Sequence, residues 1–152
     1  MERKTRVLFL STGNSTRSRM AASLLRAVAG DHLLALSAGI VPGGLDPSAI
    51  EVMKEVGIDI RGQESIEVAQ ALKIHFGYVI TLYDATKERS PILPFTFNLL
   101  QWSVLDPVTV NGLHARRIEA FRNVREAIHS RIQGFLGETA EKKQEQGVLV
   151  SV

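Results

Sequence analysis

A short polar loop follows the first apolar run of the chain and carries the residues best suited to chemistry. The run Val7–Leu10 is followed by Ser-Thr-Gly-Asn-Ser-Thr-Arg-Ser over residues 11–18, after which a helical apolar pattern begins. In such a loop, backbone N–H groups can converge on a tetrahedral anion, the helix presents its positive N-terminal end, and an Arg can bind two oxygens at once. The segment therefore predicts an oxyanion-binding site.

The spacing within this loop separates it from two other phosphate-binding loops. A Walker loop would need a Lys before its Ser/Thr, and a dinucleotide fingerprint would need three spaced glycines. A simple helix-capping turn would account for Ser15 or Ser18, but not for an Arg at this distance from an apolar strand. We therefore predict that the oxyanion is held by residues of one continuous segment: Thr12, Gly13, Asn14, Ser15, Thr16, Arg17 and Ser18.

The pattern Ser11-x5-Arg17-Ser18 resembles the Cys-x5-Arg-Ser/Thr loop of low-molecular-weight tyrosine phosphatases and of the arsenate reductases built on the same fold. In that family a Cys thiolate attacks phosphorus or arsenic, while loop amides and the Arg hold the equatorial oxygens. The resemblance implies that Ser11 stands at the position of the nucleophile. It also implies that Arg17 holds the oxygens, and that phosphate, sulfate or arsenate is the ligand.

The resemblance continues outside the loop and covers nearly all of residues 5–136. Three further segments look like the thioredoxin-coupled arsenate reductase branch more than the phosphatase branch: residues 36–40, 49–60 and 90–94. The sequence Trp-Ser-Val-Leu-Asp-Pro at 102–107 matches the segment in which both branches place their general acid. The resemblance thus implies that Asp106 protonates the leaving oxygen.

The departures from the family pattern concern the reactive residues. A Ser at position 11 is not easily ionised and would need a general base, which the loop does not supply. The whole chain contains no Cys, which excludes disulfides, thiolate metal sites and any thiol mechanism. Reductases of this branch use two further Cys in a disulfide relay, and those positions here are Tyr83 and Ser90. Thioredoxin is therefore not expected as a partner of the chain as it stands.

Three functional hypotheses remain open at this point. The chain is an arsenate reductase-like enzyme whose nucleophile is replaced, a tyrosine phosphatase acting on phosphotyrosine, or a naturally Cys-free protein that binds oxyanions without catalysis. Ser11 and Ser90 are isosteric with Cys, as in a Cys-to-Ser variant, whereas Tyr83 is not and is interpreted as native. Tyr83 and Trp102 either flank the cleft for a phenyl ring or pack within the protein.

Periodicity predicts a single α/β domain over residues 1–136. Apolar or β-rich runs predict strands at 6–10, 33–40, 78–82 and 98–104. Helical spacing predicts helices from about residue 20 to Gly30, from Asp46 to Gly57, from Ser65 to Leu72, and from Arg116 to Leu136. Strands alternating with helices imply a four-stranded parallel sheet with helices on both faces and a ligand at the carboxyl ends of the strands.

The remaining residues, 137–152, are expected to form a polar C-terminal tail. Residues 137–146 are interpreted as mobile or as a frayed helical extension. Val148–Val152 either adds a strand to a sheet edge or stays unplaced.

Composition narrows the classes of partner. The 152 residues carry a net charge of +2 without a basic block, so nucleic-acid binding is not expected. The apolar segment near the N-terminus is too short for a signal peptide or a membrane span, and a cytoplasmic location is the expectation. The spacing of the four His fits no metal-binding pair, and Ala22 and Ile66 lack the side-chain oxygens of a cation site found in some of these reductases. We expect neither a metal nor a cofactor.

Overall fold

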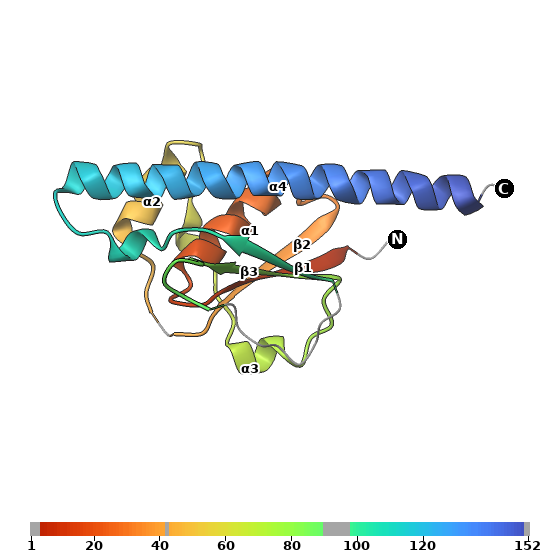
Figure 1. Cartoon of the computed structure of the whole chain (residues 1–152), viewed down its shortest axis with the longest axis horizontal. Coiled ribbons are helices and arrows are strands. Elements are labelled where there is room, and N and C mark those ends of the chain that lie inside the picture. Colours follow the sequence, from red (N-terminus) through yellow and green to blue (C-terminus); the bar gives the residue numbers. More distant parts are fainter. Residues whose placement is uncertain (1–3, 42, 90–97, 151–152) are drawn as a thin grey trace.

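A parallel four-stranded sheet forms the centre of the computed structural model, which describes residues 4–41, 43–89 and 98–150 (Figure 1). Its strands are β1 (Thr5–Ser11), β2 (Leu33–Gly39), β3 (Tyr78–Tyr83) and β4 (Leu99–Ser103), in the spatial order β2-β1-β3-β4. Each of the three strand pairs is parallel. The predicted α/β class and the four parallel strands are confirmed.

Helices cover both faces of this sheet, as expected. Helices α1 (Thr16–Ala29), α2 (Pro47–Lys54) and α4 (His114–Val150) lie on one face, and the short α3 (Val68–Ala71) lies on the other (Figure 1). Alternate residues of β1 therefore enter two apolar clusters: Val7 and Phe9 pack toward α1, α2 and α4, while Leu8 and Leu10 pack toward the α3 side. No helix in the described part of the chain is long and apolar enough to cross a membrane.

The strand register brings the carboxyl ends of neighbouring strands level with one another. Ser11, the last residue of β1, lies opposite Gly39 of β2 on one side and opposite Leu82 of β3 on the other. The chain leaves β1 toward β2 and later crosses to β3 on the far side of β1. The oxyanion loop therefore lies at the topological switch point of the sheet, where ligands of such folds bind.

The second helix begins and ends near the predicted residues. The Asp46 side chain accepts a hydrogen bond from the Ser48 amide at 2.8 Å, and Pro47 occupies the first turn. The helix ends at Lys54, and Gly57 follows it with φ +79°, a conformation that favours glycine.

Two predictions of local structure are wrong. Ser65 does not cap α3, because its hydroxyl donates to the Ser37 carbonyl at 3.3 Å and the helix begins only at Val68. The pairing of residue 66 with β2 sets this geometry: the Ile66 amide donates to the same carbonyl at 2.8 Å. The strand alternative for Val148–Val152 is also wrong over 148–150, which are helical, while residues 151–152 lie outside the described residues.

Helix α4 is longer than its apolar stripe predicts. The stripe itself is confirmed, because its members are all buried: Ile118, Phe121, Val124, Ile128, Ile132 and Phe135. The helix then continues from Leu136 to Val150, beyond the sheet (Figure 1). The helical alternative for residues 137–146 is thus the one observed, whereas the division into a domain and a tail at 136 stays a prediction.

Candidate oxyanion site

The nucleophile position of the loop lies at the end of β1, under the first turn of α1. Ser11 is completely buried, and its Oγ accepts a hydrogen bond from the Ser18 amide at 2.8 Å. The amides of a first helical turn have no partner within the helix and carry its positive partial charge. The local field at residue 11 therefore stabilises negative charge on whichever atom occupies the position of Ser11 Oγ.

The loop amides divide into two groups. The Thr12 amide donates to the Leu82 carbonyl at 3.2 Å, and the Thr16 amide donates to Asn14 Oδ1 at 2.9 Å. Within the described part of the chain, the amides of Gly13, Asn14 and Ser15 have no acceptor. These three consecutive donors are the ones that the loop can direct at an anion.

Arg17 is the largest fully buried side chain among the residues that the structure describes. Its Nη1 donates to Glu88 Oε1 at 2.8 Å and to the Val104 carbonyl at 3.1 Å, and its Nη2 donates to Glu88 Oε2 at 3.1 Å. Its Nε is buried and has no partner among the described residues. A buried donor without a partner costs about 1–3 kcal/mol of stability. An oxygen that accepts a hydrogen bond from Arg17 Nε would remove this cost, so Nε is the favoured position for an oxygen of a bound anion.

A second buried donor without a partner in the described chain belongs to the same loop, the hydroxyl of Thr16. Buried polar atoms without partners are uncommon in native proteins and need an explanation. Here Thr16 and Arg17 are consecutive residues at the start of α1. This clustering of unpartnered donors is expected of a loop that binds an anion.

Glu88 fixes the guanidinium of Arg17 from the segment after β3. Its Oε2 accepts a hydrogen bond from Thr12 Oγ1 at 2.6 Å, and its Oε1 accepts one from the Asp84 amide at 2.7 Å. Burial raises the pKa of the Glu88 carboxyl, but the hydrogen bonds from Arg17, Thr12 and Asp84 outweigh burial and lower the pKa to about 2. Glu88 is therefore ionised at neutral pH and holds Arg17 end-on, which leaves the Nε edge free.

Asp106 approaches the same guanidinium from the end of the segment after β4. Its Oδ2 lies 3.7 Å from Arg17 Nη2, and its Oδ1 accepts a hydrogen bond from the Val108 amide at 3.1 Å. The second contact fixes the carboxyl because Asp106 caps the short helix Pro107–Thr109. One carboxylate oxygen thus remains directed toward the loop, where a general acid would stand.

Two glycines allow the oxyanion loop to lie close to the Arg17 and Asp106 side chains and to the end of β2. A Cβ atom on Gly13 would lie 3.2 Å from Arg17 Nη2 and 3.3 Å from Asp106 Oδ2, within the space between the two side chains. A Cβ atom on Gly39 would lie 2.8 Å from the Ser15 amide nitrogen, closer than real Cβ atoms come. The end of β2 therefore supports the oxyanion loop by direct backbone contact.

Two further predicted site residues, Trp102 and Tyr83, lie in β4 and at the end of β3. Trp102 is 5% exposed and packs against Phe9 and Phe135, with ring centroids 5.9 and 6.5 Å apart, so the packing alternative is the one observed. Tyr83 is half-buried at the end of β3, where its carbonyl accepts from the Val104 amide at 2.8 Å. Ser90 lies outside the described residues.

Glu88 and Gly39 are site residues that the sequence interpretation missed. Glu88 is one acid in a charged turn, and no spacing rule connects it to an Arg 71 positions earlier. Gly39 belongs to a segment that resembles the family, but only the strand register shows its contact with the loop. The described residues contain no group of three or more His, Cys, Asp or Glu that could hold a metal ion; the absence of a metal or cofactor stays a prediction.

The fold and the loop define an α/β protein with an oxyanion site at the switch point of its sheet. The chain belongs to the low molecular weight phosphotyrosine protein phosphatase family, whose sequence profile matches residues 6–146. Within this family it lies in the arsenate reductase branch. It is 35% identical over 129 residues to the arsenate reductase of Oceanobacillus iheyensis, with 85% of this chain and 93% of that protein covered. It is 36% identical over 135 residues to the arsenate reductase of Bacillus subtilis, covering 89% and 96%.

Solved structures agree with this placement. An arsenate reductase in its phosphate-binding state matches with a TM-score of 0.73 and 28% identity, over 88% of this chain and 98% of that one. The tyrosine phosphatase Wzb of Escherichia coli, solved in complex with sulphate, matches with a TM-score of 0.68 and 20% identity over 90% and 99%. The second similarity concerns the fold alone.

Proposed function

We propose that this chain binds a tetrahedral oxyanion, namely phosphate, sulfate or arsenate, in the loop Thr12–Ser18. The observation that carries the proposal is the buried Nε of Arg17, which lacks a partner in the described chain although both terminal nitrogens are held by Glu88. An oxyanion on this edge would also face the amides of Gly13, Asn14 and Ser15. A related arsenate reductase was solved in a phosphate-binding state, which supports the choice of ligand.

The parent activity that we propose is arsenate reduction, and the chain as written is inactive because Ser11 replaces the nucleophile. The identity to arsenate reductases over 85–89% of the chain supports the activity. The contacts of Ser11 support the inactivity: its Oγ accepts a hydrogen bond from a backbone amide, which stabilises an anion but takes no proton away.

Two alternatives each have a specific observation in their favour. Hydrolysis of phosphotyrosine is favoured by the position of Asp106 beside Arg17 and by Tyr83, which cannot take part in a thiol relay. Oxyanion binding without catalysis is favoured by the complete absence of Cys. The natural codon at position 11 separates the last hypothesis from the other two, because a Cys codon would exclude a naturally inactive protein.

Calorimetric titration with phosphate and with arsenate tests the binding proposal. We expect Arg17→Ala to lower the affinity for both ions by tenfold or more, since a charge-assisted hydrogen bond contributes about 1.5–3 kcal/mol to binding. The matched control is Arg61→Ala, because Arg61 is exposed and Asp59, at 2.7 Å, is its one ion-pair partner among the described residues. Equal binding by both variants would refute the site.

A further inference from the structure

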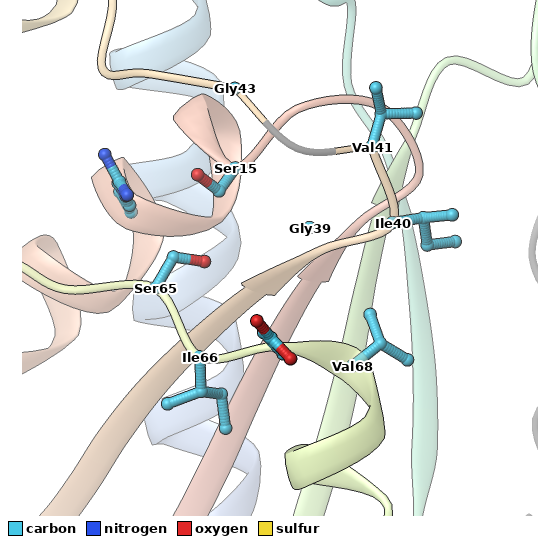
Figure 2. Close-up of a pocket in the computed structure, with 10 residues that line it drawn as sticks. Ser15, Gly39, Ile40, Val41, Gly43, Ser65, Ile66 and Val68 are labelled. Carbon is cyan, nitrogen blue, oxygen red and sulfur yellow. The ribbon is translucent and has the colours of Figure 1, made fainter.

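A cavity of about 380 Å³ lies on the β2 side of the oxyanion loop, and the proposed function leaves it unused. Its walls come from the start of α1, from the end of β2 with residues 40, 41 and 43, and from the segment that leads into α3 (Figure 2). Its size falls within the range of pockets that hold small molecules, roughly 300–1,000 Å³.

The α1 wall presents two polar groups. Ser15 is 4% exposed, yet its hydroxyl has no hydrogen-bond partner in the described chain and caps nothing. Arg19 stands four residues further along, on the same face of α1, and its Nε is buried and equally without a partner. One buried donor without a partner, Arg19 Nε, and the hydroxyl of the N-cap residue Ser15 therefore belong to side chains that line this cavity.

The opposite wall presents a carboxylate. Glu67 occupies the N-cap position of α3, but its side chain accepts no capping hydrogen bond. Although Arg19 and Glu67 line the same cavity, neither forms an ion pair with the other or with any other described residue. The cavity thus separates one cation from one anion.

The remaining surface of the cavity is largely aliphatic. Ile66 and Val68 are half-buried, and Ile40 is 46% exposed although its chain segment is fixed by a bond from its amide to the Ser11 carbonyl. The cavity thus combines aliphatic surface with two charged side chains that have no ion-pair partner in the described chain, a lining that suits an amphipathic molecule.

We propose that this cavity binds a small aliphatic zwitterion of the amino-acid type. Its carboxylate would accept hydrogen bonds from Arg19 and the Ser15 hydroxyl, and its ammonium group would donate to Glu67. Its aliphatic part would cover Ile40 and Ile66. Because Ser15 belongs both to this cavity and to the oxyanion loop, the two sites share one residue, but neither needs the other to be occupied.

Three probes that share one isobutyl group test the charge requirement by NMR titration of the methyl signals of Ile40, Ile66 and Val68. The probes are L-leucine, 4-methylpentanoate, which lacks the ammonium group, and isopentylamine, which lacks the carboxylate. We expect leucine to shift these methyl signals with saturation in the millimolar range, and each monopolar probe to bind at least fivefold more weakly. A monopolar probe that binds as tightly as leucine, or leucine that shifts no cavity methyl, overturns the proposal.

Charge-removing variants give an independent test. We expect Arg19→Gln to lower the affinity for leucine by about tenfold and Glu67→Gln to lower it by several-fold. The affinity for isopentylamine should fall only in Glu67→Gln. The exposed controls are Arg61→Gln and Glu64→Gln, which should bind leucine unchanged. If the cavity variants and their controls behave alike, the assignment is refuted. The outcome is independent of the oxyanion proposal, because Arg17→Ala should weaken phosphate binding by tenfold or more and leave leucine binding intact.

Discussion

Arg17 and Glu88 form a two-point ion pair that joins the start of α1 to the segment after β3. Both terminal nitrogens of the guanidinium meet a carboxylate oxygen, at 2.8 and 3.1 Å. Because Arg17 is fully buried, this pairing fixes its orientation before any ligand arrives. A guanidinium that is already oriented binds an anion without the cost of reorganisation, which is the condition for electrostatic stabilisation of a reacting oxyanion.

The first prediction is that Glu88→Ala destabilises the protein strongly. Removing the closer carboxylate leaves the buried Arg17 charge with the more distant Asp106, 3.7 Å away, and loss of one partner of a buried pair costs about 3–5 kcal/mol. Because the Glu88 side chain is 23% exposed, water can enter and the low end of that range is expected. Urea denaturation at pH 7 measures the loss. Glu64→Ala, an exposed acid on another segment, should cost less than about 0.5 kcal/mol; similar losses in both variants would contradict the role of the pair.

The same pair predicts a pH dependence. The Glu88 carboxyl has its pKa lowered from 4.5 to about 2 in the folded protein, so the folded state binds this proton less readily than the unfolded state does. The stabilisation is therefore complete above about pH 4.5 and is lost as the pH falls toward 2. The difference in stability between the native chain and Glu88→Gln should shrink over this interval. A difference that is constant between pH 2.5 and 7 would show that Glu88 is not a charged partner of Arg17.

Most of the fold could be predicted from the sequence because its elements have strong local signals. The apolar run of β1, the Asp46-Pro47 helix start and the stripe from Ile118 to Phe135 each depend on neighbours within a few residues. The oxyanion loop belongs to the same class of signal, since its residues are consecutive.

The partners of that loop could not be predicted, because they depend on contacts between distant segments. Glu88 lies 71 residues from Arg17, and Gly39 contacts Ser15 only through the register of β1 and β2. The Ser65 prediction failed for the same physical reason: a hydrogen bond to Ser37, 28 residues away, competes with helix capping.

A third prediction tests the support of the loop by β2. Gly39→Ala would place a Cβ atom 2.8 Å from the Ser15 amide nitrogen, so the loop must move. We expect phosphate and arsenate affinity to fall about tenfold, together with an overpacking cost of about 1–3 kcal/mol. Gly62→Ala is the matched control, because nothing lies within 4 Å of a Cβ atom at that position. Unchanged oxyanion affinity in Gly39→Ala would show that the loop conformation does not depend on this contact.

The fourth prediction is that Ser11→Cys alone gives hydrolysis of an aryl phosphate. The Ser18 amide that now donates to Ser11 Oγ at 2.8 Å would donate to the sulfur, and the start of α1 should lower the pKa of the new thiol below its free value of about 8.5. Asp106 would protonate the leaving oxygen. Turnover of p-nitrophenyl phosphate measures the gain, and adding Asp106→Asn should reduce it by about 10²-fold or more. Activity that survives this second change would mean that another group is the acid.

The last prediction concerns arsenate. One thiolate can attack arsenate, but release of arsenite and return of the enzyme to its starting state need a second thiol, which forms a disulfide with the first. Tyr83, at the end of β3, offers only a phenol. We therefore expect Ser11→Cys to show no thioredoxin-dependent arsenate reduction, whereas a triple variant that adds Tyr83→Cys and Ser90→Cys gains it.

The assay compares arsenate turnover by Ser11→Cys with thioredoxin, with glutathione and with neither. Glutathione can supply the missing second thiol from solution, so turnover with glutathione alone agrees with the prediction. Efficient turnover with thioredoxin alone would contradict it, since electrons would then reach Cys at position 11 without a thiol at position 83. In that case Tyr83 is not at a relay position, and phosphatase chemistry at this loop loses one of the two observations that favour it.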